Sequence, residues 1–207
     1  MSYQQRDAYY RKAKKEGYRS RAAYKLLELN RRFNIIKPGD RVVDLGAAPG
    51  GWLQVASELT GKRGRVIGVD LQPIEPLHET NILFLQGDIT SKDSQTKVME
   101  LLCCPADCVL SDLSPQLTGI HHADVSRSVE VARAALRMAC ALLKPKGCFL
   151  VKAFMGEETA AFVAELKRHF ASIRRTRPEA TRKGSSEIYL IARGFRELPR
   201  VTNRNKS

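Results

Sequence analysis

The stretch Asp44–Trp52, which reads Asp-Leu-Gly-Ala-Ala-Pro-Gly-Gly-Trp, constrains the fold of this chain more than any other segment. It follows a short apolar run at 41–43 and leads into a helical pattern over 53–59. A strand, a glycine-rich turn and a helix in this order build the ligand crevice of an open α/β sheet. Glycine suits such a turn because it has no Cβ to hold the backbone away from a ligand.

The spacing within this turn separates the ligands that such a crevice can hold. A dinucleotide site needs Gly-x-Gly-x-x-Gly, but here the gap after Gly46 is too long and Pro49 removes one backbone donor. A P-loop would need Gly-Lys-Ser or Gly-Lys-Thr, and neither follows. Asp44 adds a negative charge, which suits the cationic methionine end of S-adenosylmethionine better than a phosphate. The turn therefore favours S-adenosylmethionine, with a tight turn that binds no ligand as the alternative.

Three later strand patterns each end in an acid. Asp70 lies 20 residues after Gly50, where a carboxylate can accept hydrogen bonds from ribose hydroxyls. Asp88 closes the next strand pattern, where it can accept a hydrogen bond from an adenine amino group or simply cap a loop. Asp112 closes the pattern after that. Since ligands of open α/β sheets bind at the carboxyl ends of the strands, these acids indicate one shared site.

Strand and helix patterns alternate along most of the chain. Strands are expected at 41–45, 65–70, 81–86, 107–111, 147–154, about 171–177 and 186–192. Helices are expected from a Ser20 cap to about Phe33, and at 51–60, about 92–103, about 124–143 and about 157–169, with Lys144–Gly147 as the turn after the long helix. This alternation predicts one α/β domain at 19–196 with a mostly parallel sheet, an antiparallel last strand and helices on both faces. Residues 1–18 are expected to form a basic arm, flexible or marginally helical, and 197–207 a disordered basic tail.

The net charge of +13 is concentrated at the two ends of the chain. Residues 1–37 hold 11 Lys and Arg against 3 acids, and residues 167–207 hold 12 against 3. The middle of the chain, 38–166, holds 12 against 16. Basic segments of this size favour a polyanion as partner, although a merely solubilising surface is the alternative.

The remaining composition indicates a cytoplasmic protein without a metal. No apolar run approaches the roughly 20 residues of a membrane span, and the basic N-terminus lacks a secretory apolar region. The pair His121-His122 is expected in a loop, with no partner at a metal-ligand spacing. The cysteines contain no Cys-x-x-Cys pair and are expected to be buried free thiols: Cys103, Cys104, Cys108, Cys140 and Cys148.

Four charged residues have apolar neighbours in the sequence, so burying their charges would cost free energy. Lys152 interrupts the apolar strand at 148–154, Lys25 lies inside the first helix pattern, and Asp112 and Glu187 flank strands. A buried lysine needs a partner, so a structural Lys–Asp or Lys–Glu ion pair is one interpretation. The other is a set that acts on a hydroxyl, with a neutral lysine amine as proton acceptor during methyl transfer from a sulfonium.

These four residues, in this order around the Asp44–Trp52 turn, resemble the K-D-K-E set of FtsJ-type ribosomal RNA 2′-O-methyltransferases. The resemblance spans roughly residues 18–194 and includes Tyr18–Leu26, Ser111–Pro115 and Val151–Phe154, with Leu113 and Ala153 as small departures. It implies a Rossmann-like methyltransferase fold with a seven-stranded sheet, and Lys152 as general base beside Lys25, Asp112 and Glu187. It also implies that S-adenosylmethionine is bound by Gly46, Pro49, Gly50, Trp52, Asp70, Asp88 and Asp112.

The resemblance further implies the substrate, the 2′-hydroxyl of a uridine in large-subunit rRNA. The expected partner is this rRNA or the assembled 50S-type subunit, contacted by the basic N- and C-terminal segments of a monomer. One alternative is a 2′-O-methyltransferase of tRNA or another RNA. A second is a non-catalytic RNA-binding factor of ribosome assembly, and a third is an NAD-dependent oxidoreductase, which the turn disfavours.

Overall fold

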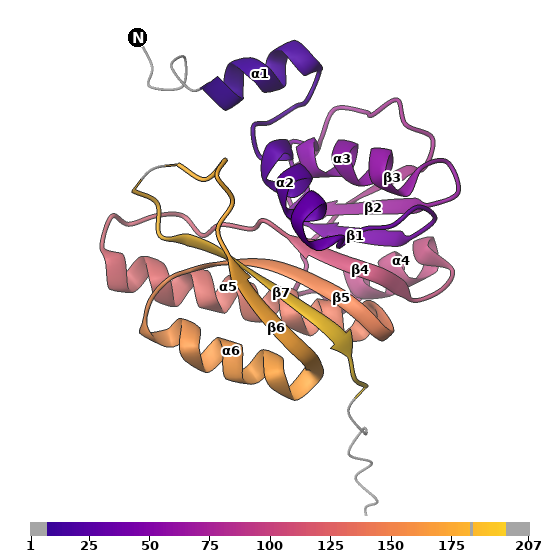
Figure 1. Cartoon of the computed structure of the whole chain (residues 1–207). Helices are drawn as coiled ribbons and strands as arrows, with labels where there is room; N and C mark the ends of the chain where they lie inside the picture. Colours follow the sequence, from indigo (N-terminus) through magenta and orange to yellow (C-terminus); the bar gives the residue numbers. More distant parts are fainter. Residues whose placement is uncertain (1–7, 183, 198–207) are drawn as a thin grey trace, which may run out of the picture.

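The structure of this chain, a computed structural model, describes residues 8–182 and 184–197. Its described strands form one sheet in the order β3-β2-β1-β4-β5-β7-β6, in which β7 runs in the direction opposite to that of the other described strands (Figure 1). The strands are β1 (Arg41–Leu45), β2 (Arg65–Asp70), β3 (Ile82–Gln86), β4 (Ala106–Ser111), β5 (Leu143–Phe154), β6 (Phe170–Thr176) and β7 (Glu187–Phe195). The predicted mostly parallel sheet with an antiparallel last strand is confirmed.

Helices cover both faces of this sheet, as the near-continuous apolar runs of its central strands require. They are α1 (Ala8–Glu16), α2 (Ala23–Phe33), α3 (Gly51–Thr60), α4 (Lys92–Leu102), α5 (His121–Leu142) and α6 (Glu157–His169). Successive β1 residues point to opposite faces: Val42 packs with α2 and α3, whereas Val43 packs with α4, α5 and α6. Each fully buried large side chain, such as Phe149 or Phe162, contributes about 1.5–3 kcal/mol through removal from water.

The strand order reverses between β1 and β4, which lie side by side. From β1 the chain moves outward to β2 and β3, then returns across the sheet to β4 and continues to β5. The connections that follow β1 and β4 therefore leave in opposite directions, and open α/β sheets bind ligands at the carboxyl ends of two such strands. Asp44 lies near the end of β1, and Asp112 lies directly after β4. The fold thus positions the predicted acids at one edge.

Three boundaries differ from the expectations. Helix α2 begins at Ala23 without a side-chain cap, because Ser20 lies in a preceding turn and packs against the backbone of Gly51. Helix α5 begins at His121, so the two histidines are helical rather than in a loop. The expected turn at Lys144–Gly147 lies within β5 as an irregularity in its pairing with β4, where Lys146 takes a φ of 67°.

The described part of the N-terminal segment is helical. Helix α1 turns Ala13 inward, where it is 2% exposed and packs with Tyr24 and Ala180. The hydroxyl of Tyr24 donates to Glu16 at 2.7 Å, which fastens the end of α1 to α2. Residues 1–7 and most of the expected tail at 197–207 lie outside the described residues.

The cysteine side chains match the expectation from the sequence only in part. All five thiols are free, but Cys103 and Cys104 are exposed, so the prediction of buried thiols is wrong for these two. They follow α4 at its left-handed end, where the chain turns away from the core. Among the described helices, none has the length and apolar character needed to cross a membrane.

Candidate active site

The turn after β1 has a shape that glycine alone can hold at two positions. Gly46 and Gly50 have φ values of 84° and 109°, in the left-handed region that other residues avoid. A Cβ on Gly46 would also collide with the side chain of Leu113, which follows β4. The backbone N–H of Gly50 donates to Ala47 at 2.7 Å and closes the turn before α3 begins. The backbone of this turn is therefore held in one conformation that a ligand can approach closely.

Trp52 supports the turn from within the core. Its ring is 4% exposed and its indole N–H donates to the carbonyl oxygen of Ala22 at 2.8 Å. The ring also lies 6.1 Å from that of Tyr189, centroid to centroid. Trp52 thus joins the first turn of α3 to the segment before α2.

Asp70 joins the turn to the segment that follows β2. Its two carboxylate oxygens accept backbone N–H groups from Ala48 and Gln72, each at 2.9 Å. Each oxygen keeps a second lone pair, so the side chain can still accept ribose hydroxyls. Asp88 is exposed and caps its own loop through Oδ1, which accepts the backbone N–H and the hydroxyl of Thr90 at 2.8 Å. These bonds lower the pKa of Asp88 and leave Oδ2 outside the cap.

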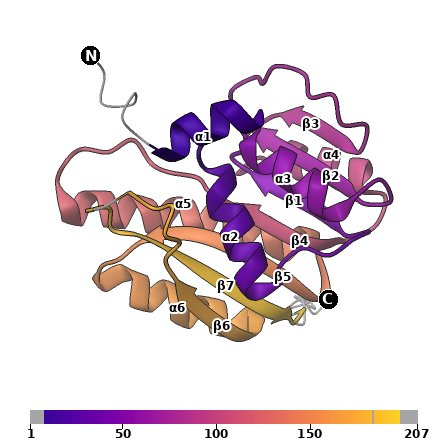
Figure 2. The same ribbon diagram turned by 45° about the horizontal axis from the view of Figure 1, so that its top comes forward.

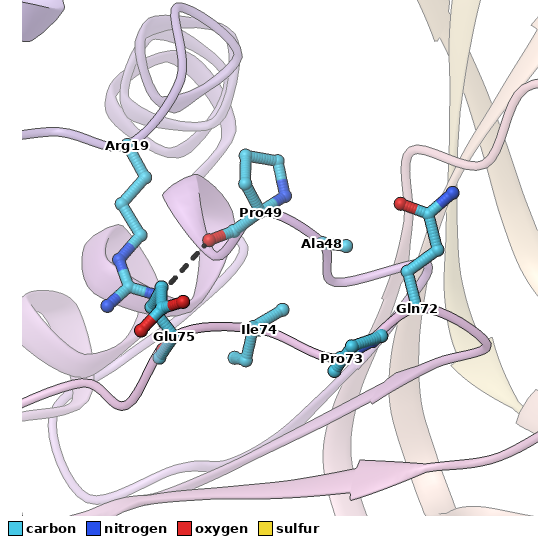
Figure 3. Close-up of a pocket in the computed structure, with 7 residues that line it drawn as sticks. All are labelled: Arg19, Ala48, Pro49, Gln72, Pro73, Ile74 and Glu75. Carbon is cyan, nitrogen blue, oxygen red and sulfur yellow. Dashed lines mark hydrogen bonds between the residues drawn. The ribbon is translucent and has the colours of Figure 1, made fainter.

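A cavity of about 560 Å³ lies between the glycine-rich turn and the segment after β2 (Figure 3). The guanidinium of Arg19 spans its mouth, donating to the carbonyl oxygens of Pro49 at 3.3 Å, Glu75 at 2.5 Å and Pro76 at 2.6 Å. Arg19 was not among the residues expected at the site, since a basic residue before a helix carries no distinctive sequence signal. The residues that line the cavity are Arg19, Ala48, Pro49, Gln72, Pro73, Ile74 and Glu75.

Asp44 is the most unusual acid at this edge. It is 1% exposed, and among the described residues neither carboxylate oxygen has a hydrogen-bond partner. Burial raises its pKa well above the usual range, and the nearby charges of Asp112 and Asp70 add to the effect. A buried, unpaired carboxylate is costly, so this position calls for either a proton or a cationic group from a ligand.

The four charged residues singled out in the sequence meet as two ion pairs on the α2 side of the sheet. Lys152 Nζ lies 3.2 Å from Asp112 Oδ1 and donates to the main-chain oxygen of Asp112 at 2.7 Å. Lys25 Nζ lies 2.9 Å from Glu187 Oε2. Both lysines are below a tenth exposed, so each amine is held by its acid rather than by bulk water.

Tyr189 connects the two pairs and was missed in the sequence. It faces Lys152 across the β5–β7 ladder, its hydroxyl donates to Asp112 Oδ1 at 2.6 Å, and Lys25 Nζ lies 5.6 Å from its ring centroid. Its spacing of two residues from Glu187, which puts both on one face of β7, is the signal that could have identified it.

The charges around Asp112 favour its ionised form. Burial alone would raise the pKa of Asp112, but the Lys152 and Lys25 charges and the Tyr189 hydroxyl hold it below the usual range. Burial and the Asp112 charge raise the pKa of Tyr189 well above its usual value, so its hydroxyl keeps its proton as a donor. Buried ion pairs add little net stability compared with apolar packing. The two pairs therefore need not be explained by stability alone.

The sheet order with its antiparallel β7 and the glycine-rich turn after β1 define a Rossmann-like methyltransferase. The chain belongs to the FtsJ-like methyltransferase family, whose sequence profile matches residues 18–195. The resemblance found in the sequence motifs is confirmed, and the oxidoreductase alternative is set aside.

Relatives of known name agree over nearly the whole chain. Ribosomal RNA large subunit methyltransferase E of Methanothrix thermoacetophila is 51% identical over 199 residues, which cover 96% of this chain and 76% of that protein. The protein of the same name from Archaeoglobus fulgidus is 49% identical over 192 residues, covering 93% and 97%. A crystal structure of a ribosomal RNA methyltransferase from Plasmodium falciparum has a TM-score of 0.78 and 30% identity, covering 86% of this chain and 98% of that one.

Proposed function

We propose that this protein transfers a methyl group from S-adenosylmethionine to the ribose 2′-hydroxyl of a uridine in large-subunit rRNA. The main support for the proposal is the position of Lys152. This residue is 5% exposed, and its amine lies 2.7 Å and 3.2 Å from two oxygens of Asp112. It lies at the same sheet edge as the glycine-rich turn. The names of the relatives supply the class of RNA.

The residues at this edge fit S-adenosylmethionine. The carboxylate of Asp44, which has no hydrogen-bond partner among the described residues, would pair with a ligand that carries positive charge. The backbone at Gly46 and Gly50 permits close approach, and the spare lone pairs of Asp70 suit the ribose hydroxyls. Asp88 Oδ2 is available for the adenine amino group. When bound, the cofactor supplies a methyl carbon made electrophilic by its sulfonium.

Lys152 acts as the proton acceptor in this proposal. Lys152 would act as the neutral amine, after the ammonium of its ion pair with Asp112 has released one proton to solvent. It would then accept the proton of the 2′-hydroxyl as the methyl group leaves the sulfur for the 2′-oxygen. Asp112 holds this amine through both its carboxylate and its main-chain oxygen, so the acceptor is positioned before the substrate arrives. The Tyr189 hydroxyl donates to Asp112 and orients its carboxylate, and the Lys25–Glu187 pair lies beside Tyr189. The role of the protein is therefore positioning together with removal of one proton.

An Asp44→Asn variant tests the cofactor side of the proposal. Because the folded-state pKa of Asp44 is raised, the folded, cofactor-free protein loses stability relative to the unfolded chain, whose carboxyl ionises first, as the pH rises above the unfolded value of about 3.9. We expect the variant to be more stable at pH 7 by on the order of 1–3 kcal/mol, with the gain vanishing near pH 3. We also expect weaker S-adenosylmethionine binding. Denaturant unfolding at both pH values and calorimetric titration measure the two effects, and unchanged stability with unchanged affinity would refute this role.

Methyl transfer to defined RNAs tests the proposed reaction. Labelled S-adenosylmethionine is supplied with free large-subunit rRNA, isolated large subunits, whole ribosomes and tRNA, each from a strain that lacks this protein. We expect label in the large-subunit rRNA of at least one of these samples. Label in tRNA instead would support the tRNA alternative, and RNA binding without transfer to any sample would support the assembly-factor alternative.

A further inference from the structure

Two exposed arginines lie on the connection between β6 and β7, and a third contacts it. Arg177 and Arg182 belong to the connection between β6 and β7, which ends directly before Glu187, and both are exposed. Arg21 precedes α2 and donates to the carbonyl oxygen of Ala180 in the same connection. In both views this connection lies on the opposite side of the molecule from α4 (Figures 1 and 2). We call the two exposed arginines, Arg177 and Arg182, the arginine rim.

Backbone atoms hold the arginine rim in place. The guanidinium of Arg177 donates to the carbonyl oxygen of Arg182 at 3.2 Å, and Arg32 donates to the carbonyl oxygen of Arg177 at 3.5 Å. The backbone N–H of Glu179 donates to Glu28 on α2 at 2.8 Å. The connection is thus docked onto α2, and among the residues that the structure describes no carboxylate forms an ion pair with Arg177 or Arg182. Order that exists before binding reduces the entropy lost when a ligand arrives.

The charges around the rim leave a positive surplus. Glu187 forms an ion pair with Lys25 at 2.9 Å, and Glu28 forms one with Arg32 at 3.0 Å. Glu179 is the remaining acid of the described connection, against Arg177 and Arg182. Cations on one short connection repel each other, and an anion bound between them would relieve that repulsion.

We propose that the arginine rim binds a phosphodiester of the RNA substrate and so places the target ribose at Lys152. This inference rests on the proposed function and specifies the RNA-binding part of that site. A 2′-hydroxyl is separated from the 3′-phosphate of its own nucleotide by only two ring carbons and one oxygen. A ribose at the ion pairs therefore carries phosphates to positions close to the rim. Arginine suits this role because its planar fork of donors matches phosphate oxygens.

The test uses the full-length double variant Arg177→Ala/Arg182→Ala. Binding of a single-stranded RNA oligonucleotide and of an rRNA fragment is measured by fluorescence anisotropy over a range of salt concentrations. Each lost phosphate contact lowers the slope of log affinity against log salt by about 0.7, so we expect a decrease of about 0.7 for the one phosphodiester that the rim holds. At a fixed moderate salt concentration we expect Kd to rise by about 10-fold. In methylation assays, KM for RNA should rise far more than kcat falls.

Two further variants separate the phosphate site from a general effect on the fold. Arg177→Lys/Arg182→Lys keeps both charges and should restore most of the salt slope. Arg63→Ala removes an exposed arginine just before β2 and should leave RNA binding at the wild-type level. Affinity for S-adenosylmethionine should be the same in all of these proteins. A double variant with wild-type salt slope and Kd would overturn the inference. A wild-type protein that shows the expected slopes but transfers no methyl group would instead refute the proposed function and leave the rim intact.

Discussion

We expect a Lys152→Ala variant to transfer methyl groups at least about 10²-fold more slowly than the wild-type protein, the usual scale for losing a general base. The amine is removed from a position fixed by two oxygens of Asp112, and Tyr189 keeps its proton too firmly to serve as a substitute base. Single-turnover transfer of labelled methyl groups to rRNA measures the effect on the chemical step, separate from product release.

The Lys152→Ala variant should still bind S-adenosylmethionine, which a binding measurement can check. Lys152 is not among the residues that line the cavity beside the glycine-rich turn, so affinity for S-adenosylmethionine should change little. The matched control is Lys144→Ala, which removes a lysine of the same strand, β5, that is ion-paired with Asp107 and is half-exposed. This control should keep full activity. Full methylation by Lys152→Ala would show that the proton leaves by another route.

The second large effect is expected for Asp112→Ala. This change leaves Lys152 buried with only the main-chain oxygen of residue 112 and removes the acceptor of the Tyr189 hydroxyl. Removing one partner of a buried pair costs about 3–5 kcal/mol of the free energy of unfolding. Methyl transfer should fall about as far as in the lysine variant, because the amine is no longer held in place. Denaturant unfolding at pH 7 and single-turnover assays measure the two losses.

The stability effect of Asp112 has a defined pH dependence. Its folded-state pKa lies below the unfolded value of about 3.9, so its stabilising contribution is complete above that pH. The contribution is lost as the pH falls through the lower folded-state value. The gap in unfolding free energy between wild type and Asp112→Ala should therefore narrow in acid. A gap that is constant with pH, or absent at pH 7, would contradict the ion pair described for this site.

Much of this site follows from sequence because strand ends are a local property. Asp70, Asp88 and Asp112 each close an apolar run, and parallel strands bring such ends to one edge. Which lysine pairs with which acid depends instead on the position of α2 over the sheet and on the register of β7 against β5. These are long-range properties that no short segment encodes.

The residues missed in the sequence share this dependence on distant partners. Arg19 is bonded to carbonyl oxygens about 30 and 56 residues away in sequence, and Tyr189 to a carboxylate 77 residues away. The late start of α2 has a similar cause, since Ser20 packs against Gly51 instead of capping the helix. Local propensity describes the helix that Ser20 could start, whereas tertiary packing decides the one that forms.

Mass mapping of the methylated nucleotide tests directly whether this protein is a 2′-O-methyltransferase of large-subunit rRNA. Large-subunit rRNA from a strain lacking this protein is incubated with the protein and S-adenosylmethionine, digested, and compared with an untreated sample. We predict one new methyl group, located on the ribose 2′-oxygen of a uridine. A methyl group on a base, or on the ribose of a tRNA and not of rRNA, would contradict the account.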